Sequence, residues 1–253
     1  MPGVSDTAFY LGSLPVYWYG ICIALGVFAG ALVLFLREAR LGLPKDTGLD
    51  AALWAVPMGL VFARAFYVAF RWEEFAGDPA SILYLHKGGL AIYGGLMGGG
   101  AALFCHARAK KISFALLLDL LAPALAIGQA IGRWGNFFNQ EAYGIAAPEV
   151  LCWFPASVLI EAEGGWHLAT FFYESLWCLL VFFYLLHREK KVKGRPGDLF
   201  LRYGLLYGLE RMLVEGLRTD SLYLGPLRVS QLISLVLVLA TGTGLIVRRE
   251  RRT

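Results

Sequence analysis

The segment from Tyr17 to Leu36 reads YWYGICIALGVFAGALVLFL and contains no charged residue. Its length matches the apolar core of a bilayer, which a helix of about 20 apolar residues can cross. The preceding residues, from Met1 to Val16, include no Lys or Arg, so the segment lacks the basic start of a cleavable signal peptide. We therefore expect it to form a transmembrane helix that stays in the mature protein.

The rest of the chain repeats this pattern. The 253 residues are 58% hydrophobic and 17% charged, whereas soluble domains have about 45–50% apolar and about 25% charged residues. Apolar runs alternate with charged or Gly/Pro-rich connections, which is typical of transmembrane helices. The sequence predicts an all-α polytopic membrane protein with a single integral membrane domain over residues 1–253. Its seven predicted spans are 17–36, 51–70, 89–106, 114–131, 169–186, 199–215 and 229–247.

Basic residues gather in alternate connections between these spans. By the positive-inside rule those connections face the cytoplasm. The longest of the others, 132–168, contains four glutamates and is predicted to be an extracytoplasmic loop. The N-terminus is therefore expected outside and the C-terminus in the cytoplasm. The predicted cytoplasmic residues are Arg37, Arg40 and Lys45; Arg108, Lys110 and Lys111; Arg188, Lys190, Lys191, Lys193 and Arg195; and Arg248, Arg249, Arg251 and Arg252.

Other classes of function find no support in the composition. The net charge of +4 is explained by this topology beside an anionic membrane leaflet, so we expect no nucleic-acid partner. The four cysteines, Cys22, Cys105, Cys152 and Cys178, are widely spaced and indicate neither a disulfide framework nor a zinc site. No metal and no cofactor are expected.

Ionisable residues nevertheless occur inside the apolar spans, where each costs about 2.5–3.5 kcal/mol on insertion scales. In the sixth span Tyr203, Tyr207, Arg211 and Glu215 recur every four residues and share one face of a helix. One interpretation is a pair of charges that stabilises its own helix at i,i+4 spacing. The other is a functional polar stripe, which we favour because a buried ion pair rarely repays its desolvation. Further ionisable residues in or next to the spans are Arg64, Asp119, Arg133, Glu174 and Glu210.

The third span begins in a glycine-rich stretch, Lys87 to Gly100, with the sequence KGGLAIYGGLMGGG. Glycines at small-xxx-small spacing often do no more than let helices pack closely. Around Tyr93, however, the glycine pairs lie at the outer edge of the span, where bare backbone N–H groups favour an anion. We therefore expect Gly94 and Gly95 to contribute to a binding site.

The strongest functional signal is the segment from Gly132 to Gly144, GRWGNFFNQEAYG, which follows the fourth span. Arg133 offers a rigid fork of donors that suits a phosphate. Asn136 and Asn139 are able to hydrogen-bond ester or glycerol oxygens, and Glu141 to orient an arginine or accept a proton. So many polar groups in a short aromatic stretch are hard to attribute to packing. A purely structural outer loop, the other interpretation, would be solvated and less aromatic, so we favour a binding site for a phosphate-bearing ligand.

This segment resembles the signature of the prolipoprotein diacylglyceryl transferases, and the resemblance extends in the correct order over nearly the whole chain. Tyr17 to Gly20 is similar to the family's aromatic-Tyr-Gly opening, and Ala63-Arg64 with Tyr67-Val68 to its Gly-Arg-x-x-Tyr-Val pattern. Asp119 with Ala122-Pro123 fits the stretch before the signature, and YGLERMLVEGLR, from Tyr207 to Arg218, resembles the C-terminal motif. Two positions depart from the family pattern: Tyr93 replaces a common histidine, and a His-Pro-x-x-x-Tyr-Glu segment is reduced to Tyr173-Glu174 with His167 one residue out of register.

The resemblance implies transfer of the diacylglyceryl group from phosphatidylglycerol to the lipobox cysteine of prolipoproteins. This is the first step of bacterial lipoprotein maturation, at the cell (inner) membrane. The expected partners are phosphatidylglycerol, prolipoprotein signal peptides and the bilayer; a transporter or a non-enzymatic binder of an anionic lipid is the alternative. Catalytic roles are expected for Arg133, Arg211, Glu141, Glu215 and Tyr93, and phosphatidylglycerol binding for Arg133, Asn136, Asn139, Gly144, Tyr19, Tyr207, Arg64, Gly94 and Gly95.

Within this site we expect Arg133 and Arg211 to clamp the phosphate, with Glu141 and Glu215 holding the two arginines in place. Tyr93 is expected to accept the thiol proton. His86 and a carboxylate remain the alternative bases.

Overall fold

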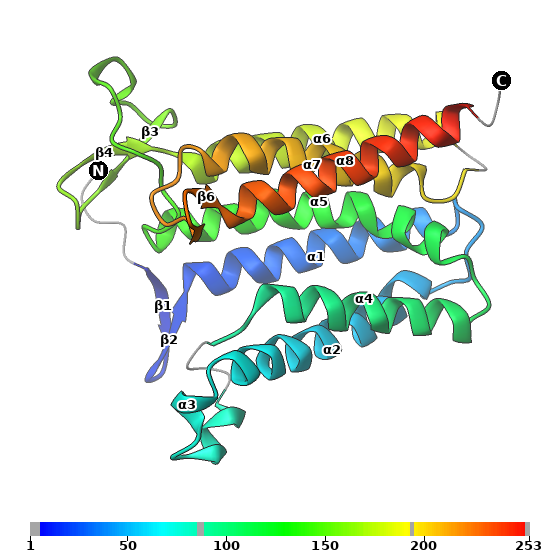
Figure 1. Cartoon of the computed structure of the whole chain (residues 1–253), viewed down its shortest axis with the longest axis horizontal. Helices are drawn as coiled ribbons and strands as arrows, with labels where there is room; N and C mark the ends of the chain where they lie inside the picture. Colours follow the sequence, from blue (N-terminus) through cyan, green and yellow to red (C-terminus); the bar gives the residue numbers. More distant parts are fainter. Residues whose placement is uncertain (1–5, 85–88, 193–194, 251–253) are drawn as a thin grey trace. The chain divides into compact units, whose positions relative to one another are not determined.

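The computed structural model describes residues 6–84, 89–192 and 195–250, and these are mostly helical (Figure 1). Each of the seven predicted spans corresponds to a long helix. Short elements connect them: the four-residue helix α3 (Trp72–Phe75), the 3-10 helices η1 (Pro79–Leu83) and η3 (Glu149–Leu151), and three antiparallel two-stranded sheets. The long helices are α1 (Trp18–Glu38), α2 (Thr47–Phe70), α4 (Ile92–Ala109), α5 (Phe114–Phe138), α6 (Thr170–Val192), α7 (Asp198–Glu215) and α8 (Val229–Glu250). The sheets pair β1 (Thr7–Leu11) with β2 (Leu14–Tyr17), β3 (Ser157–Ile160) with β4 (Gly165–Leu168), and β5 (Tyr223–Leu224) with β6 (Leu227–Arg228).

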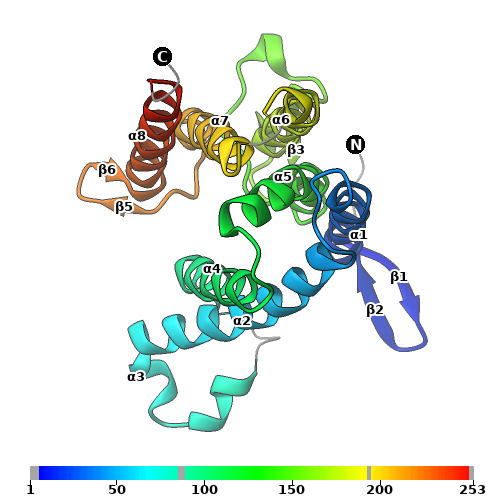
Figure 2. The ribbon, with the colours of Figure 1, turned by 90° about the vertical axis from the view of Figure 1, so that its right-hand side faces the viewer.

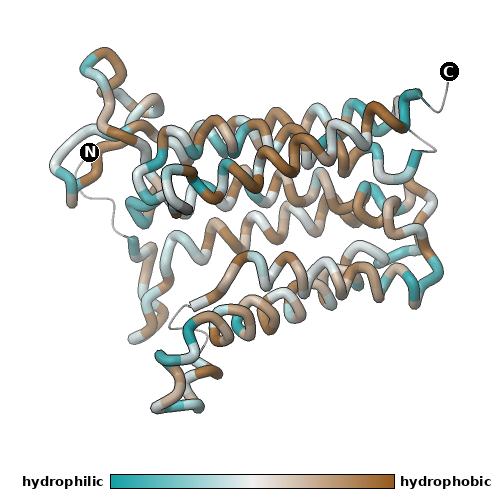
Figure 3. The backbone as a smooth tube through the Cα atoms, in the orientation of Figure 1, coloured by the Kyte–Doolittle hydropathy of each residue, from teal (hydrophilic) through white to brown (hydrophobic). Residues whose placement is uncertain are grey.

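The predicted class, an all-α membrane protein, agrees with the apolarity of these helices. Among the described residues, five helices are long and apolar enough to cross a bilayer: α1, α2, α5, α6 and α8. Figure 3 shows hydrophobic residues along these helices and hydrophilic residues toward many helix ends. The remaining two long helices are more polar, because α4 contains many glycines and α7 carries five charged side chains.

The chain divides into two compact units, residues 1–33 with 121–253 and residues 34–120. In the first unit α7 lies between α6 and α8 (Figures 1 and 2). Helices α1 and α5 approach closely through small residues: a Cβ at Gly26 would lie 2.9 Å from the carbonyl oxygen of Gly128, and one at Gly30 would lie 3.3 Å from that of Ala124. These glycines therefore set the spacing of α1 and α5.

The second unit is built on the pair α2 and α4, which pack along their length (Figure 1). A Cβ at Gly98 would lie 2.5 Å from Cβ of Phe62, and one at Gly94 would overlap the Phe62 carbonyl. The N–H of Gly95 donates to the carbonyl of Ala91 at 3.2 Å, so it belongs to the helix's own hydrogen bonding. Gly94 and Gly98 therefore serve close helix packing, while the expected contribution of Gly94 and Gly95 to a binding site stays a prediction.

Helix α5 is longer than the sequence pattern predicts. It continues past Ile131 to Phe138, so Arg133 and Asn136 lie on the helix and not in the loop after it. The hairpin of β3 and β4 packs beside this end of α5. Val158 and Ile160 from β3 form an apolar cluster with Phe171 of α6, against which Trp134 packs. This cluster fixes the ends of α5 and α6, where the polar residues meet.

Candidate functional site

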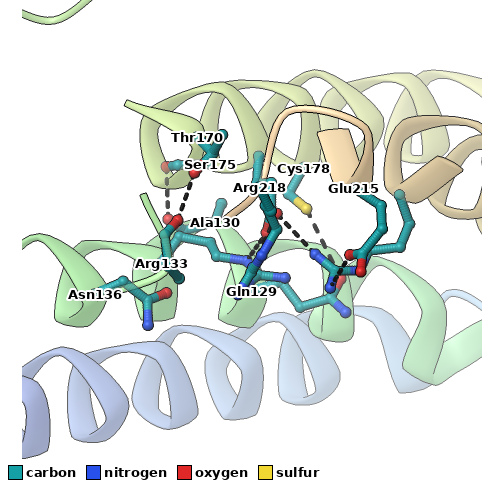
Figure 4. Close-up of polar contacts among 12 residues, drawn as sticks. Gln129, Ala130, Arg133, Asn136, Thr170, Ser175, Cys178, Glu215 and Arg218 are labelled. Atoms are coloured by element: carbon teal, nitrogen blue, oxygen red, sulfur yellow. Dashed lines mark hydrogen bonds and ion pairs between the residues drawn. The ribbon is translucent and has the colours of Figure 1, made fainter. Parts of the chain in front are cut away.

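A single buried carboxylate joins three helices at the centre of the candidate site. Glu174, on α6, is 1% exposed and pairs with Arg133 of α5 through the arginine Nε. Its other oxygen lies 2.9 Å from a terminal nitrogen of Arg211 on α7, and 3.5 Å from one of Arg218, which follows α7. Figure 4 shows Arg133, Arg218 and Glu215 gathered between the helices. We call Arg133, Arg211, Arg218, Glu174, Glu215 and Asp220 the arginine cluster.

The cluster continues along α7 and beyond its end. Arg211 also contacts Glu215 one turn later, at 2.7 Å, as the i,i+4 spacing predicts. Because Arg211 binds a carboxylate on α6 as well, this pair does more than stabilise its own helix. Arg218 binds Asp220 with two hydrogen bonds of 2.8 and 2.6 Å. The hydrogen bond from Arg218 and its positive charge lower the pKa of the Asp220 carboxyl.

The sequence places these side chains through contacts next to the charges. Ser175 follows Glu174, and its hydroxyl donates to the carbonyl of Ala130 at 2.6 Å while accepting from the indole N–H of Trp134 at 3.1 Å. Both partners flank Arg133 on α5. A buried serine thus holds α5 and α6 in the register that brings Arg133 to Glu174.

Arg133 keeps donors for a ligand, whereas both terminal nitrogens of Arg211 already contact carboxylates. Arg133 uses its Nε for Glu174, and in the described part of the chain its two terminal nitrogens have no ion pair or hydrogen bond. Its side chain is 23% exposed and that of Arg211 is 17% exposed, whereas Glu174 and Glu215 are 1% exposed. The buried carboxylates orient the guanidiniums, which stay partly accessible to a ligand. Oriented guanidinium donors in a partly dry site bind phosphate or another oxyanion well.

The signature segment gives Glu141 a different partner from the expected arginine. Its carboxylate accepts a hydrogen bond from Asn136 at 2.8 Å and a longer one from Asn139 at 3.5 Å. The cause is a chain reversal after α5, with left-handed backbone at Gln140 and Ala142 (φ 49 and 56°), which returns Glu141 to the helix end. Glu141 therefore orients the amide of Asn136, and Glu174 takes the place beside Arg133.

Tyr19 lies on α1 beside this reversal. A Cβ at Gly135 would lie only 2.7 Å from the Tyr19 ring, so glycine is needed for the tyrosine to pack on α5. Tyr19, Asn139, Glu141 and Asp6 are among the residues that line one open pocket near the hairpin of β1 and β2. The predicted binding residues Tyr19 and Asn139 therefore share a surface with Glu141.

Gly144 lies at a crossing of three backbone segments. Its N–H donates to Leu168 at 2.8 Å, and it forms an isolated bridge with Arg218. A Cβ here would lie 2.9 Å from Cβ of Leu168 and 3.0 Å from the carbonyl oxygen of Leu217. The backbone at Gly144 therefore packs against the backbone at Leu217 and Arg218 and helps to hold Arg218 at the cluster.

The tyrosines of the stripe on α7 face α5. The Tyr203 hydroxyl donates to the side-chain oxygen of Gln129 at 2.9 Å. The ring of Tyr207 stacks on that of Tyr203, with centroids 5.9 Å apart. The polar stripe predicted from the sequence therefore faces the protein interior. Along α7, Tyr207 lies between Tyr203 and Arg211.

The other predicted site residues belong to the second unit. Arg64 is buried, and its guanidinium donates to the carbonyls of Ile82, Gly89 and Ser81 at 2.8, 2.9 and 2.8 Å. These three hydrogen bonds hold the chain segment that precedes α4, so Arg64 has a structural role there. Tyr93, the second residue of α4, is 39% exposed. His86 lies outside the described residues.

Sequence reasoning did not select three members of the cluster as site residues: Glu174, Arg218 and Asp220. Glu174 stood out only as a charge in an apolar span, and Arg218 only as part of a motif. Both carried a usable signal: Glu174 is an acid in a span that has two arginine-bearing neighbours, and Arg218 follows Arg211 by seven residues, two turns of a helix. What the sequence lacks is the packing that points Glu174 at both α5 and α7.

Comparison with known proteins identifies similar chains over the full length. A family described as "Prolipoprotein diacylglyceryl transferase" matches residues 6–247. A "Phosphatidylglycerol--prolipoprotein diacylglyceryl transferase" of Bacillus cereus (strain G9842) is 45% identical over 258 residues, which cover 99% of this chain and 94% of the relative. Proteins with the same name from Bacillus cereus (strain B4264) and Bacillus anthracis (strain A0248) are 45% and 44% identical over the same coverage.

Proposed function

The chain belongs to the prolipoprotein diacylglyceryl transferase family, and on this premise we propose that its arginine cluster binds the phosphate of phosphatidylglycerol. The protein is a transferase that moves a diacylglyceryl group from phosphatidylglycerol to a prolipoprotein. This identity sets aside the alternatives of a transporter and a non-enzymatic lipid binder. The acceptor that we propose is the thiol of the lipobox cysteine.

The main support for the proposed phosphate site is that two arginines share the carboxylate of Glu174. Arg133 and Arg211 come from different helices, yet both bind this one group. Two guanidiniums held beside each other form a clamp for a phosphodiester, which presents two oxygens to bidentate donors. Because the buried carboxylates already fix the arginines, little reorganisation is needed when the ligand arrives.

The proposed chemistry is a displacement at carbon. The thiolate sulfur attacks the carbon of the diacylglyceryl group that bears the phosphate oxygen. A carbon–sulfur bond forms, the carbon–oxygen bond breaks, and glycerol phosphate leaves with the electron pair. The departing phosphate gains negative charge, so donors from Arg133 and Arg211 stabilise the transition state more than the bound lipid.

The thiol must lose its proton, because free cysteine has a pKa near ~8.5 and the thiolate is the nucleophile. We assign proton acceptance to Tyr93, whose hydroxyl makes no hydrogen bond to any residue that the structure describes. His86 is the competing base. Asn136, oriented by Glu141, is assigned to the lipid's glycerol or ester oxygens, and Tyr19, Asn139 and Tyr207 to contacts around them.

For the topology we propose seven spans in the cell membrane, which is the inner membrane of bacteria that have two. Helix α7 contains charged residues, but its Arg211 and Glu215 face partners in α6 and α7 and not lipid. Helix α4 packs its glycines on α2. The N-terminus faces out and the C-terminus in, since the C-terminal ends of α1, α4 and α8 carry basic residues.

A Glu163→Cys variant without native cysteines should react with an impermeant maleimide in intact cells, and a Lys110→Cys variant should not.

The clamp is tested by diacylglyceryl transfer to a lipobox peptide in proteoliposomes containing phosphatidylglycerol. Arg133→Lys and Arg211→Lys keep the charge but lose the fork of donors, and each should lower kcat about 10²–10³-fold, as loss of one oxyanion donor does. Arg71→Lys, at an exposed pair with Glu74, is the control and should retain turnover. Near-normal turnover of both cluster variants would exclude the clamp.

The base is tested in the same assay. Tyr93→Phe should abolish most turnover, and His86→Ala should have a small effect. A fully active Tyr93→Phe together with an inactive His86→Ala would assign the proton to His86 instead.

A further inference from the structure

Glu210, on α7 next to Arg211, is a buried acid for which the mechanism above has no use. It is 3% exposed, and in the described part of the chain neither of its carboxylate oxygens has a hydrogen-bond partner. Burying an ionised carboxylate without donors is far more costly than burying the neutral acid. Glu174 and Glu215 are buried to the same degree, but both have arginine partners.

Charged groups from α5, α6, α7 and the segment after α7 surround Glu210. It interacts electrostatically with Arg133 of α5, Glu174 of α6, Arg211 beside it on α7, and Arg218 after α7. The thiol of Cys178 on α6 and the Tyr207 hydroxyl on α7 are the neutral titratable groups that interact with it. The part of α8 that packs on α7 near this position contributes no ionisable side chain before Arg248.

The charge balance decides which form of Glu210 fits the cluster. The three arginines are matched by the three carboxylates of Glu174, Glu215 and Asp220. In this balanced state an arriving phosphodiester meets no net repulsion and finds guanidinium donors unoccupied. An ionised Glu210 would make the cluster negative before the phosphate arrives.

We propose that Glu210 is a positioning residue that acts as a neutral acid, leaving Arg133 and Arg211 free to hold an anionic lipid, and that its ionisation weakens phosphatidylglycerol binding. This inference rests on the proposed function of the arginine cluster. Glu210 is then a fourth carboxyl group at the site, and its protonation state sets the charge that the lipid meets at the arginines.

The consequence is a pH dependence of lipid affinity. One ionisation linked to binding raises KM by at most about tenfold for each pH unit above the inflection. In the wild-type enzyme, KM for phosphatidylglycerol should therefore rise on the alkaline side. Glu210→Gln has nearly the same shape but no ionisation, so its KM should stay level over the range in which the wild-type KM rises.

The experiment measures KM and kcat for phosphatidylglycerol between pH 6 and 9.5 in mixed micelles, together with thermal unfolding at pH 7. Glu210→Gln should flatten the KM profile and unfold no earlier than wild type, because it resembles the neutral form. Glu163→Gln, at an exposed carboxylate that accepts from Tyr143, should keep the wild-type profile. Glu210→Asp keeps the titratable group and should keep the alkaline rise in KM.

Coincident KM profiles for wild type and Glu210→Gln would overturn the inference, as would a marked loss of thermal stability in Glu210→Gln, which would reveal an ionised glutamate. Either result leaves the phosphate clamp standing, since the clamp fails only when Arg133→Lys and Arg211→Lys stay active.

Discussion

Glu174→Gln tests whether one carboxylate organises the site. Glutamine has almost the same size and keeps one oxygen acceptor, so packing against α5 and α7 is preserved while the negative charge is lost. Arg133 then has no carboxylate partner among the described residues, whereas Arg211 keeps Glu215 and Arg218 keeps Asp220. The variant therefore releases mainly Arg133.

The size of the effect follows from burial. Breaking a fully buried ion pair costs about 3–5 kcal/mol, because a charge is left unpaired. The side chain of Arg133 is 23% exposed and so is not fully buried, and we expect a smaller loss of about 1–3 kcal/mol. For a chain of this size that corresponds to a fall in Tm of roughly 2–12 °C.

The loss of activity should exceed what the loss of stability explains. An arginine that is no longer oriented contributes less to the transition state, and kcat should fall by about 10²–10³-fold at temperatures where the variant is folded. The assay combines thermal unfolding in detergent with transferase turnover in proteoliposomes. Glu74→Gln, which removes a carboxylate from an exposed pair, should change neither.

Glu174→Asp separates charge from reach. It keeps the charge but shortens the side chain by one methylene, so it should restore part of the stability and little of the turnover. If Glu174→Gln retains turnover within about threefold of wild type and the same Tm, the shared carboxylate does not organise the arginines.

Two further predictions concern the segments around the cluster. Gly144→Ala places a methyl group 2.9 Å from the Leu168 side chain, so it should destabilise the protein by about 1–3 kcal/mol and lower its turnover. Gly165→Ala is the control, because its methyl group would lie 3.9 Å from the nearest atom, and it should change neither thermal unfolding nor turnover. Asp220 has a lowered pKa because of its hydrogen bond from Arg218, so its stabilising effect is present above about pH 4, its unfolded pKa, and is lost as pH falls through the folded pKa. The Tm difference between wild type and Asp220→Asn should therefore shrink as the pH falls below about 4, and a difference that does not depend on pH would contradict the pairing.

Much of the helical fold was predictable from apolar run length. The run from Tyr17 to Leu36 predicts α1 (Trp18–Glu38) to within two residues at each end. The end of α5 was not predictable in this way, because the polar signature after Ile131 resembles a loop by composition. Its residues stay helical since Trp134 and Phe137 pack on Phe171, a contact between segments far apart in the sequence.

The same distinction applies to the site. The spacing of Arg211 and Glu215 predicts their contact, because a helix brings residues four apart together. The partner of Arg133 was beyond local reasoning: Glu141 is eight residues away and Glu174 is forty-one residues away, yet Glu174 is the one in contact. Backbone reversal at Gln140 turns Glu141 toward Asn136, and no helical spacing encodes that reversal.

The arrangement of charges also explains how a chain this apolar tolerates so many ionisable groups in its helices. Arg133 on α5, Arg211 on α7 and Arg218 just after α7 would each be costly alone, but they converge on Glu174, so one buried acid compensates part of the cost for all three. Glu174 does not pair every donor, because the two terminal nitrogens of Arg133 have no partner in the described chain. Those nitrogens are best satisfied by an anion that arrives from outside the protein. A site whose charges are balanced before the ligand arrives, and whose Arg133 still has donors to offer, fits the proposed binding of a phospholipid and release of glycerol phosphate.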